Sequence, residues 1–576
     1  MQRIKFLVVV ILILSGGTTA LHAQSPPFPT NHWVYDFLER MEVKGILTNI
    51  FDGTRPMSRD EIAGYLSQIL SDPQSLTRLN SVEKRQLHYL TLEFRDYLAP
   101  EFREKALKAA PRLMKYRRMG FLSKIFPNHL YTNGRNLFQY SEEDFLAVLD
   151  PVLYRSGFWA KTDTGTSARR DFRDTHGVTS WGRWGKHLSF YFDFRDSKIW
   201  GSRKYPVGDN YSLPGIGYTR SFGSYVDFDE TQAGIIVGGK HWQVTLGKER
   251  NAWGPGYWGS LAISDNPTSY DQVKLQVRFR KFKFTSISGI LRPCPNLVAY
   301  SYYTGYFQRD ILSRKYMAAH RLDVAPFRFL KIGFQEVLIY GERNPEIGYV
   351  NPINYYWSEE HNLGDQDNST IGATFQLLPG FSSKIYGELF IDDLKTSKLG
   401  TGWYGNKWAV LVGAFRADLF SVPNLDARIE YVRIRPYVYT HRYPVNRFEN
   451  FATPLGYWTG PNSETLTGLL SYRFSRWGTI GVQSMIWKHG ANPPGQNAGG
   501  DLQLPHRVFD PIQARTLGGD LETRIHTSAT VSYEWFRNFV TRFEIRSIRE
   551  KNVVLNTGRR GDINTWGGFV AVGFNY

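Results

Sequence analysis

Two stretches of the sequence bring together the residue types that bind sugars, namely aromatic rings beside carboxylates and arginine. An aromatic face packs on the apolar surface of a sugar ring, while carboxylates and guanidinium groups hydrogen-bond hydroxyl or charged groups. In the first stretch, residues 247–266, Trp-Gly-Pro-Gly at 253–256 predicts a tight turn, because glycine accepts positive φ and proline fixes its own. The candidate saccharide-binding residues there are Glu249, Arg250, Trp253, Tyr257, Trp258 and Asp265.

The second stretch, residues 351–368 together with 386–393, is acidic. Its candidate binding residues are Glu359, His361, Asp365 and Asp367, beside Glu360 and Asp393. In an interior of net positive character we expect these acids to pair with Arg and Lys. The spacing Asp365-x-Asp367-Asn368 contains part of a Ca²⁺ loop pattern and lacks the rest. Glu359 and Asp365 are also the residue types of a paired-carboxylate glycosidase, although the sequence does not set their separation.

The first stretch also has a structural interpretation. In that interpretation it is a packed, inward-facing loop held by internal ion pairs, with its tryptophans in a membrane girdle. The sequence has no Gly-x-Ser-x-Gly elbow, no His-Glu-x-x-His and no P-loop. It therefore predicts binding without catalysis, with no catalytic residue, no cofactor and no metal site. A single cysteine, Cys294, excludes an intramolecular disulfide.

The N-terminus has the pattern of an export signal, which we predict over residues 1–23. Arg3 and Lys5 precede the apolar run 6–14, and Ala23 is a plausible cleavage point. Beyond it we find no apolar run near the roughly 18 residues that a spanning helix needs. The mature chain is therefore expected to be either soluble outside the inner membrane or a β-barrel.

Composition favours the barrel. Aromatic residues make up 15% of the 576 residues, yet the mean hydropathy is −0.38, which suits strands that are apolar on one face only. The formal charge of +17 favours anionic partners, or serves solubility and attraction to membrane surfaces. Because the chain is predicted to be exported, we expect outer-membrane lipids, lipopolysaccharide or acidic polysaccharide, and not nucleic acid.

Residues 24–125 read as a small helical domain, either periplasmic or a plug. Apolar residues recur at helical spacing among charges, and Ser58-x-x-Glu61 predicts a capping box at the start of one helix. From about residue 145 the pattern changes to segments of roughly ten residues that alternate apolar and polar positions, such as 187–195 and 273–280. We predict an antiparallel outer-membrane barrel over residues 145–576 with about 16–18 strands. The long irregular stretches 202–214, 440–463 and 489–519 are predicted to be extracellular loops.

The last eleven residues, 566–576, give the clearest barrel signal. Val570, Val572, Phe574 and Tyr576 share one face of a strand, because side chains alternate with period two. We expect this apolar face to meet lipid, while Ala571, Gly573 and Asn575 face inward. The terminal aromatic resembles the signal by which the barrel-assembly machinery recognises its substrates, so Phe574 and Tyr576 are predicted to act in insertion. The alternative is the last strand of a soluble β-protein.

The stretch 247–266 and the stretch 340–393, which includes Asn351-Pro-Ile-Asn-Tyr-Tyr-Trp and Tyr386-Gly-Glu, resemble the capsule-assembly Wzi family of outer-membrane barrels. The resemblance implies a lectin-like surface protein that binds or organises capsular polysaccharide or exopolysaccharide. No individual binding residue of that family is carried over. The alternatives are a porin or exporter for anionic solutes or polysaccharide, and an outer-membrane enzyme that modifies glycans or lipids. An open lumen would favour a porin, and a convergent acid/base pair at an exposed mouth would favour an enzyme. The sequence specifies no oligomeric state.

A second resemblance lies in the helical region. Trp33-Val-Tyr, Lys44-Gly-Ile, Phe51-Asp-Gly-Thr-Arg-Pro and Ser58-Arg-Asp-Glu-Ile-Ala resemble one S-layer-homology unit over about 31–66. Such units usually occur in threes and bind cell-wall polymers. Here one copy is visible, so two interpretations stay open: packing beneath the barrel, or binding to the wall.

Overall fold

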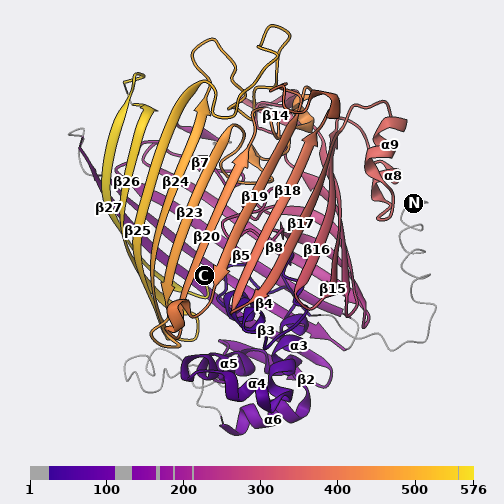
Figure 1. Ribbon diagram of the computed structural model, residues 1–576, viewed down its shortest axis with the longest axis vertical. Coiled ribbons are helices and arrows are strands. Elements are labelled where there is room, and N and C mark those ends of the chain that lie inside the picture. Colours follow the sequence, from indigo (N-terminus) through magenta and orange to yellow (C-terminus); the bar gives the residue numbers. More distant parts are fainter. Residues whose placement is uncertain are drawn as a thin grey trace.

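Alternating strands close into a barrel, as the sequence predicts. The computed structural model describes residues 25–109, 131, 133–163, 169–185, 188–209, 213–555 and 557–576, so the predicted signal 1–23 lies outside the described residues. Within this part, 18 antiparallel strands form a closed ring (Figure 1). The last strand, β27 (Arg560–Phe574), pairs with the first, β3 (Phe145–Thr162), and closes it.

The remaining wall strands follow one another in chain order, each hydrogen-bonded to the next. They are β4 (Arg169–Trp184), β5 (Leu188–Gly201), β8 (Tyr225–Gly238), β9 (Trp242–Glu249), β11 (Tyr270–Arg278), β12 (Phe282–Leu291), β15 (Lys315–Phe327), β16 (Leu330–Gly341), β17 (Asn368–Gly380), β18 (Ser383–Asp393), β19 (Lys407–Arg416), β20 (Leu425–Ile434), β23 (Ser463–Tyr472), β24 (Gly478–Ala491), β25 (Asp520–Phe536) and β26 (Phe539–Val554).

The described residues also form short strands and turns besides the 18 wall strands. They are β1 (Thr54–Arg55), β2 (Phe138–Glu142), β6 (Gly208–Asp209), β7 (Arg220–Ser221), β10 (Ala252–Trp253), β13 (Val298–Thr304), β14 (Phe307–Leu312), β21 (Glu449–Asn450), β22 (Thr453–Pro454), η3 (Thr396–Lys398), η4 (Leu419–Ser421) and η5 (Pro444–Asn446).

Period-two alternation sets which side chains face out. On β26, Phe543 and Ile545 are exposed on the outer face. Glu544 between them points inward and forms ion pairs with Arg542 and Arg546. Val570 and Phe574 of β27 lie directly opposite Phe543 and Phe539, so they share the outward side of the strand, although Phe574 is buried there against Tyr131.

Tyr576 departs from the expected alternation. The strand ends at Phe574, and Asn575 adopts a left-handed conformation with φ of 55°. This turn sends Tyr576 inward, where its ring stacks on Tyr154 at 3.9 Å between centroids, with Arg195 over its other side at 4.9 Å. The prediction that Tyr576 shares the lipid-facing side with Phe574 is therefore wrong.

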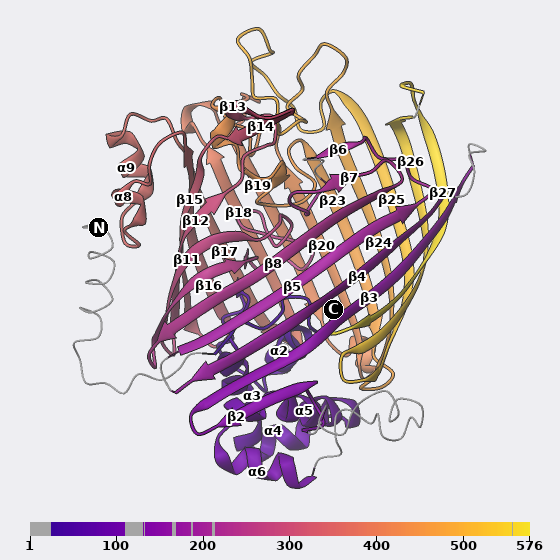
Figure 2. The same ribbon diagram turned by 180° about the vertical axis from the view of Figure 1, so that it is seen from behind.

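A helical plug fills one end of the barrel, which we call the helix end; the opposite end is the loop end (Figures 1 and 2). Its apolar residues form one core beneath the barrel, built around Phe37, Leu66 and Leu90. Among the described residues, no helix combines the length and apolar character needed to cross a bilayer. The plug comprises α2 (Val34–Val43), α3 (Arg59–Ser71), α4 (Pro73–Arg78), α5 (Ser81–Glu93), η1 (Arg95–Tyr97) and α6 (Pro100–Ala109).

The capping box predicted at Ser58 is absent, and one occurs elsewhere. Ser58 occupies the N-cap of α3 but its side chain makes no cap hydrogen bond. Glu61 instead pairs with Lys283 and Arg278 on the barrel wall, each at 3.3 Å. The wall cations thus draw the carboxylate away from the helix end. The box is formed at α5, where Asn80 and Glu83 cap each other's backbone.

Acidic side chains of the plug meet basic side chains at the base of the wall strands. Lys331 of β16 contacts Glu42 at 2.9 Å and Asp52 at 3.0 Å. Lys384 of β18 contacts Asp52 at 2.9 Å and Glu39 at 3.1 Å, and Arg428 of β20 also pairs with Glu39. All of these groups are buried. Since a buried charge without a partner is very costly, these pairs fix where the plug can sit.

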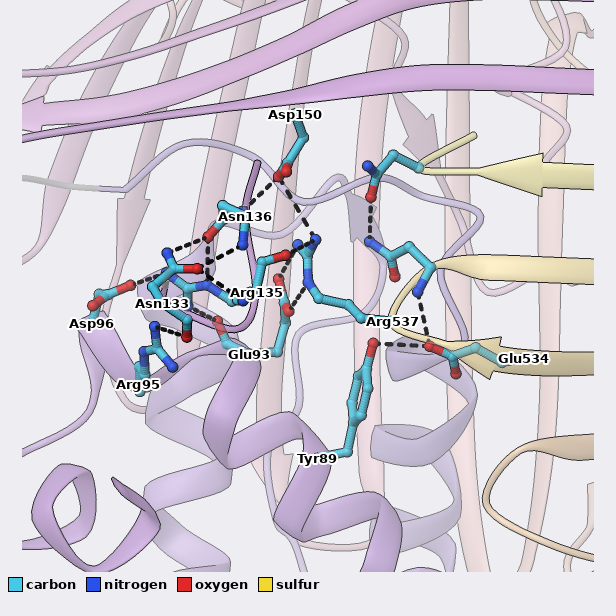
Figure 3. A network of polar contacts seen from close by, with 12 residues as sticks. Tyr89, Glu93, Arg95, Asp96, Asn133, Arg135, Asn136, Asp150, Glu534 and Arg537 are labelled. Atoms are coloured by element: carbon cyan, nitrogen blue, oxygen red, sulfur yellow. Dashed lines mark hydrogen bonds and ion pairs between the residues drawn. The ribbon is translucent and has the colours of Figure 1, made fainter. Parts of the chain in front are cut away.

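A second network joins α5 to the turn between β25 and β26 (Figure 3). Arg537 donates from Nε to Glu93 at 2.7 Å and from a second nitrogen at 3.0 Å, which is a two-point contact. Tyr89 donates to Glu534 of β25 at 3.0 Å. Arg135, which precedes β2, donates to the carbonyl of Glu93 at 2.7 Å and so ties this segment to the same helix.

Replacing Lys384 with Met should loosen the plug while leaving the barrel closed. The change leaves Glu39 and Asp52 short of one buried cation each, which we expect to cost about 3 kcal/mol or more of docking free energy. Faster hydrogen exchange across residues 34–71, with unchanged exchange in the wall strands, would report it. The control is Lys281→Met, an exposed lysine in the β11–β12 turn. Equal exchange in the two variants would contradict the assigned role.

Acid should also undock the plug. Burial tends to raise the pKa of Glu39, but Arg428 and Lys384 outweigh it and hold the pKa at about 2, below the ordinary 4.5. Asp52 is depressed as well, against its own burial, by Lys331 and Lys384, whereas burial raises the pKa of Glu42. A carboxyl group whose pKa is lower in the folded protein stabilises the fold at pH values above its unfolded-state pKa. That stabilisation is lost as the pH falls through the folded-state pKa.

We therefore expect pepsin cleavage within residues 34–71 to increase as pH falls from 4.5 towards 2, relative to an unfolded reference peptide. The opposing contribution of Glu42 makes the transition shallower. A cleavage rate in this segment that merely follows the reference peptide would count against the ionic docking.

Candidate functional site

The first sugar-binding candidate stretch folds into the barrel as a packed loop. Its strand β10 pairs with β1 of the plug, which places Trp253 opposite Thr54, and Trp253 is almost completely buried. Wall carboxylates hold the loop through its backbone. Glu388 accepts hydrogen bonds from the N–H groups of Leu261 at 2.9 Å and Ala262 at 3.2 Å. The middle of the lumen is therefore occupied by this loop.

The Trp-Gly-Pro-Gly run makes the predicted turn, and one of its glycines is required by close packing. A Cβ on Gly256 would lie 1.9 Å from the carbonyl oxygen of Gly259. The turn next presents the N–H of Tyr257 to Glu430 on β20, at 2.9 Å. The loop and the wall are thus matched at the backbone as well as at side chains.

A second loop also packs into the lumen. Residues 440–463 were predicted to be an extracellular loop, yet this loop and the preceding Tyr439 pack inward. Tyr439 donates to the carbonyl of Leu261 at 2.7 Å, and Ser264 donates from its backbone to Leu455 at 2.7 Å. Phe448 joins them in one core cluster with side chains of the wall. Backbone groups that would face an empty lumen find partners in the neighbouring loop instead.

The candidate residues of the first stretch are engaged in internal contacts. Glu249 is buried and pairs with Lys274, and Arg250 pairs with Glu230 at 2.8 Å. Trp258 donates to Gln483 at 3.0 Å, and the guanidinium of Arg428 lies 4.2 Å from the ring centre of Tyr257.

Asp265, which is exposed, accepts a hydrogen bond from Thr30 at 3.3 Å. The structure thus matches the packed-loop interpretation of the first stretch, except that Trp253 and Trp258 lie inside the barrel and not in a membrane girdle.

Residues 351–368 of the second stretch lie outside the barrel, contrary to the expectation that their acids face the lumen, whereas residues 386–393 belong to the wall strand β18. The segment 347–362 contains α8 (Ile347–Val350) and α9 (Tyr356–Asn362), which both views show beside the wall (Figures 1 and 2). Glu336 of β16 neighbours the inward-facing Gln335, and therefore points outward. It accepts the N–H groups of Tyr356 at 3.0 Å and Trp357 at 2.7 Å. An outward carboxylate on the wall thus fixes α9 against the outer face.

The acids of this hairpin are separated and mostly partnered. Asp367 is held by Arg343 and by the hydroxyl of Tyr349 at 2.7 Å. Burial raises the pKa of Glu360 to about 8, and nearby acids including Asp365 contribute. His361 lies 2.6 Å from the carbonyl of Trp357. Across the described residues, no group of three or more His, Cys, Asp or Glu side chains could hold a metal ion.

Sequence reasoning missed a hairpin at the loop end. The strands β13 and β14 stand at that end in both views (Figures 1 and 2). Five large aromatic side chains are exposed on them and on their turn, with Tyr303 at 75% and Tyr306 fully exposed. The run Tyr-Ser-Tyr-Tyr-Thr-Gly-Tyr-Phe was the available signal, since it places aromatics on both faces of a hairpin. The exposed aromatic residues are Tyr300, Tyr302, Tyr303, Tyr306 and Phe307.

One solved structure shares this fold over nearly the whole chain. The chain is similar to a structure described as Wzi of Escherichia coli, an outer-membrane protein involved in group 1 capsule assembly and a carbohydrate-binding β-barrel. The TM-score is 0.54 at 13% identity, covering 96% of this chain and 100% of that one. OccAB4 of Acinetobacter baumannii matches with a TM-score of 0.41 at 10% identity, over 75% of this chain and 98% of its own. OprD of Pseudomonas aeruginosa matches with a TM-score of 0.40 at 11% identity, over 74% and 93%.

Among curated proteins, none matches the sequence significantly. The family comparison is decisive, because a family model described as capsule assembly protein Wzi matches residues 158–546. This range includes the loop with residues 247–266, the helices α8 and α9, and most of the wall strands. The chain belongs to the Wzi capsule assembly family.

Proposed function

We propose that this protein is an outer-membrane barrel that binds and organises capsular polysaccharide or exopolysaccharide at the cell surface. The observation that carries the proposal is the contrast between the two ends. The helix end is closed by a docked plug, and two packed loops occupy the lumen, whereas the loop end presents an exposed aromatic hairpin. Exposed aromatic patches on an otherwise polar surface mark binding sites. The description of the Escherichia coli relative as carbohydrate-binding supports the same function.

The orientation in the membrane follows from this proposal. The helix end would face the periplasm and the loop end the exterior, after export directed by residues 1–23. The net charge of +17 would favour contact with anionic lipid headgroups and lipopolysaccharide. The S-layer-homology-like unit 31–66 packs beneath the barrel, since Asp52 is held by two wall lysines. Its binding to a wall polymer stays a prediction.

The filled lumen favours a binding protein over a porin. A porin requires a continuous aqueous path, and here Trp253, Phe448 and Tyr457 are buried in the middle of the lumen. Catalysis by Glu359 and Asp365 has no support from the geometry, because the hairpin that carries them packs on the outer face of the wall through Glu336. We therefore propose binding without chemistry.

Removing the aromatic hairpin should weaken polysaccharide binding. We expect Tyr302→Ala, Tyr303→Ala and Tyr306→Ala together to lower the affinity of the purified protein for the strain's own surface glycan by about tenfold or more, as loss of several aromatic contacts implies. A matched control is Phe381→Ala, an exposed aromatic in the β17–β18 turn at the helix end. Planar-bilayer conductance is measured on the same preparation. Porin-like conductance together with no glycan binding by the unaltered protein would overturn the proposed function.

The insertion signal can be divided between the two terminal aromatics. Phe574 lies on the outer face and packs with Phe536 and Phe539, whereas Tyr576 is turned inward. We expect Phe574→Ala to reduce the amount of folded barrel in the outer membrane severalfold, and Tyr576→Ala to reduce it less. Quantifying the heat-modifiable folded form in outer-membrane fractions compares the two. A larger defect for Tyr576→Ala would show that recognition does not depend on the outward side of the last strand.

A further inference from the structure

A cavity of about 440 Å³ lies against the inner face of β3, β4, β5, β26 and β27, on the side of the barrel opposite α8 and α9. It is lined mainly by the inward residues of these strands and by the segment that follows β5. Four arginines dominate its polar surface: Arg169, Arg173, Arg203 and Arg546. None of them belongs to the stretches that the sequence singled out.

The cavity carries an excess of positive charge. Asp171 is the only carboxylate among the described residues that line it. That carboxylate is already engaged by Arg169 and accepts the backbone N–H of Arg203 at 3.4 Å. The side chain of Arg169 is half exposed, so the cavity communicates with solvent. An anionic ligand would therefore be attracted to it.

Two of the arginines have hydrogen-bonding capacity that the protein leaves unused. The Nε atoms of Arg173 and Arg546 are buried and have no hydrogen-bond partner. Arg173 makes one long hydrogen bond, to Ser197 at 3.4 Å, and Arg546 pairs with Glu544 at 2.8 Å through an η nitrogen. Six other arginines among the described residues also have a buried nitrogen without a partner, so these two donors point to a ligand only together with the charge excess of the cavity.

Aromatic faces lie between these cations. The guanidinium of Arg546 is 5.1 Å from the ring centre of Phe158 and 5.7 Å from that of Phe569. The guanidinium of Arg169 lies 5.7 Å from the centre of the same Phe158 ring. The cavity therefore offers apolar faces next to charged donors. An inorganic anion would use the donors alone, whereas a sugar ring with an acidic group would use both kinds of surface.

We propose that this cavity binds a carboxylate-bearing sugar residue of the polysaccharide, such as a uronate. The planar carboxylate pairs with the guanidinium groups of Arg173 and Arg546, which line the cavity, and the sugar ring packs beside Phe158 and Phe569. This inference rests on the proposed function and narrows it, because it makes the acidic sugar the recognised unit. The β13–β14 hairpin then binds the polysaccharide through its aromatic residues, and the cavity binds the acidic sugar through its arginines.

The test uses the full-length protein in detergent, with calorimetric titration of three probes: tetragalacturonate, neutral maltotetraose and inorganic phosphate. We expect tetragalacturonate to bind, and maltotetraose and phosphate to bind much more weakly. The double variant Arg173→Gln with Arg546→Gln should lower the affinity for tetragalacturonate by about tenfold or more, since it removes charge-assisted hydrogen bonds. Arg442→Gln, an exposed arginine of the loop end on the other side of the barrel, is the matched control.

A misfolded variant would imitate the expected loss, so heat-modifiable gel mobility is measured for each protein. A second variant, Phe158→Ala, keeps all four arginines and should lose tetragalacturonate affinity while keeping any phosphate affinity. Equal binding of phosphate and tetragalacturonate would overturn the sugar assignment. Unchanged tetragalacturonate binding in the folded double variant would overturn the cavity assignment. If the native polysaccharide still binds in either case, the proposed function survives; if it does not bind the unaltered protein, that function fails separately.

Discussion

The ionic fit between the plug and the base of the wall is the constraint on which the rest of the structure depends. Strands that alternate polar and apolar residues necessarily direct charged side chains inward, and a charge inside a barrel needs a partner. Lys331, Lys384 and Arg428 find theirs on the plug, in Glu39, Glu42 and Asp52. Because Asp52 is shared between cations of β16 and β18, and Glu39 between cations of β18 and β20, the plug has one position that satisfies them all. The plug therefore completes the barrel electrostatically as well as sterically.

The same requirement explains how the lumen is filled. Loops that enter a barrel bring backbone N–H groups that must be satisfied, and inward wall carboxylates accept them here. Glu388 receives Leu261 and Ala262, and Glu430 receives Tyr257. The loop that carries Trp253 is thereby held against the wall, and Trp253 is buried among plug and wall. The aromatic residues of this loop, which the sequence suggested as sugar-binding residues, are instead packed in the interior of the barrel. Recognition is left to the surfaces that remain accessible, at the loop end and in the arginine cavity.

Sequence periodicity predicted the parts of the fold that depend on local alternation. The barrel, its strand number and the outward faces of Val570 and Phe574 follow from period two, which one strand expresses by itself. Prediction from the sequence failed where the position of a side chain depends on a contact with a residue far away in the chain. Glu61 was expected to cap a helix, but Lys283 and Arg278 on the wall draw it away. The acidic stretch was expected inside, but Glu336 holds α9 outside, and nothing in the order of residues 351–368 encodes that contact. Tyr576 turned inward because a single residue, Asn575, left the extended conformation.

Interior arginines differ in how completely the protein satisfies their hydrogen-bonding groups. Arg321 donates from all three of its nitrogens, to Asp323, Gln335 and Thr374, and Arg537 donates likewise to Glu93 and to the carbonyl of Arg135. Such side chains are saturated and hold the protein together. Arg173 and Arg546 stand in the same wall, yet each keeps a buried donor without a partner. Other interior arginines, such as Arg433 and Arg447, also keep a buried nitrogen without a partner, so the unused donors alone do not mark a site. What distinguishes the cavity is that four arginines meet there with one carboxylate, Asp171, which is already engaged, so its surplus of positive charge favours an anionic acceptor from outside the chain.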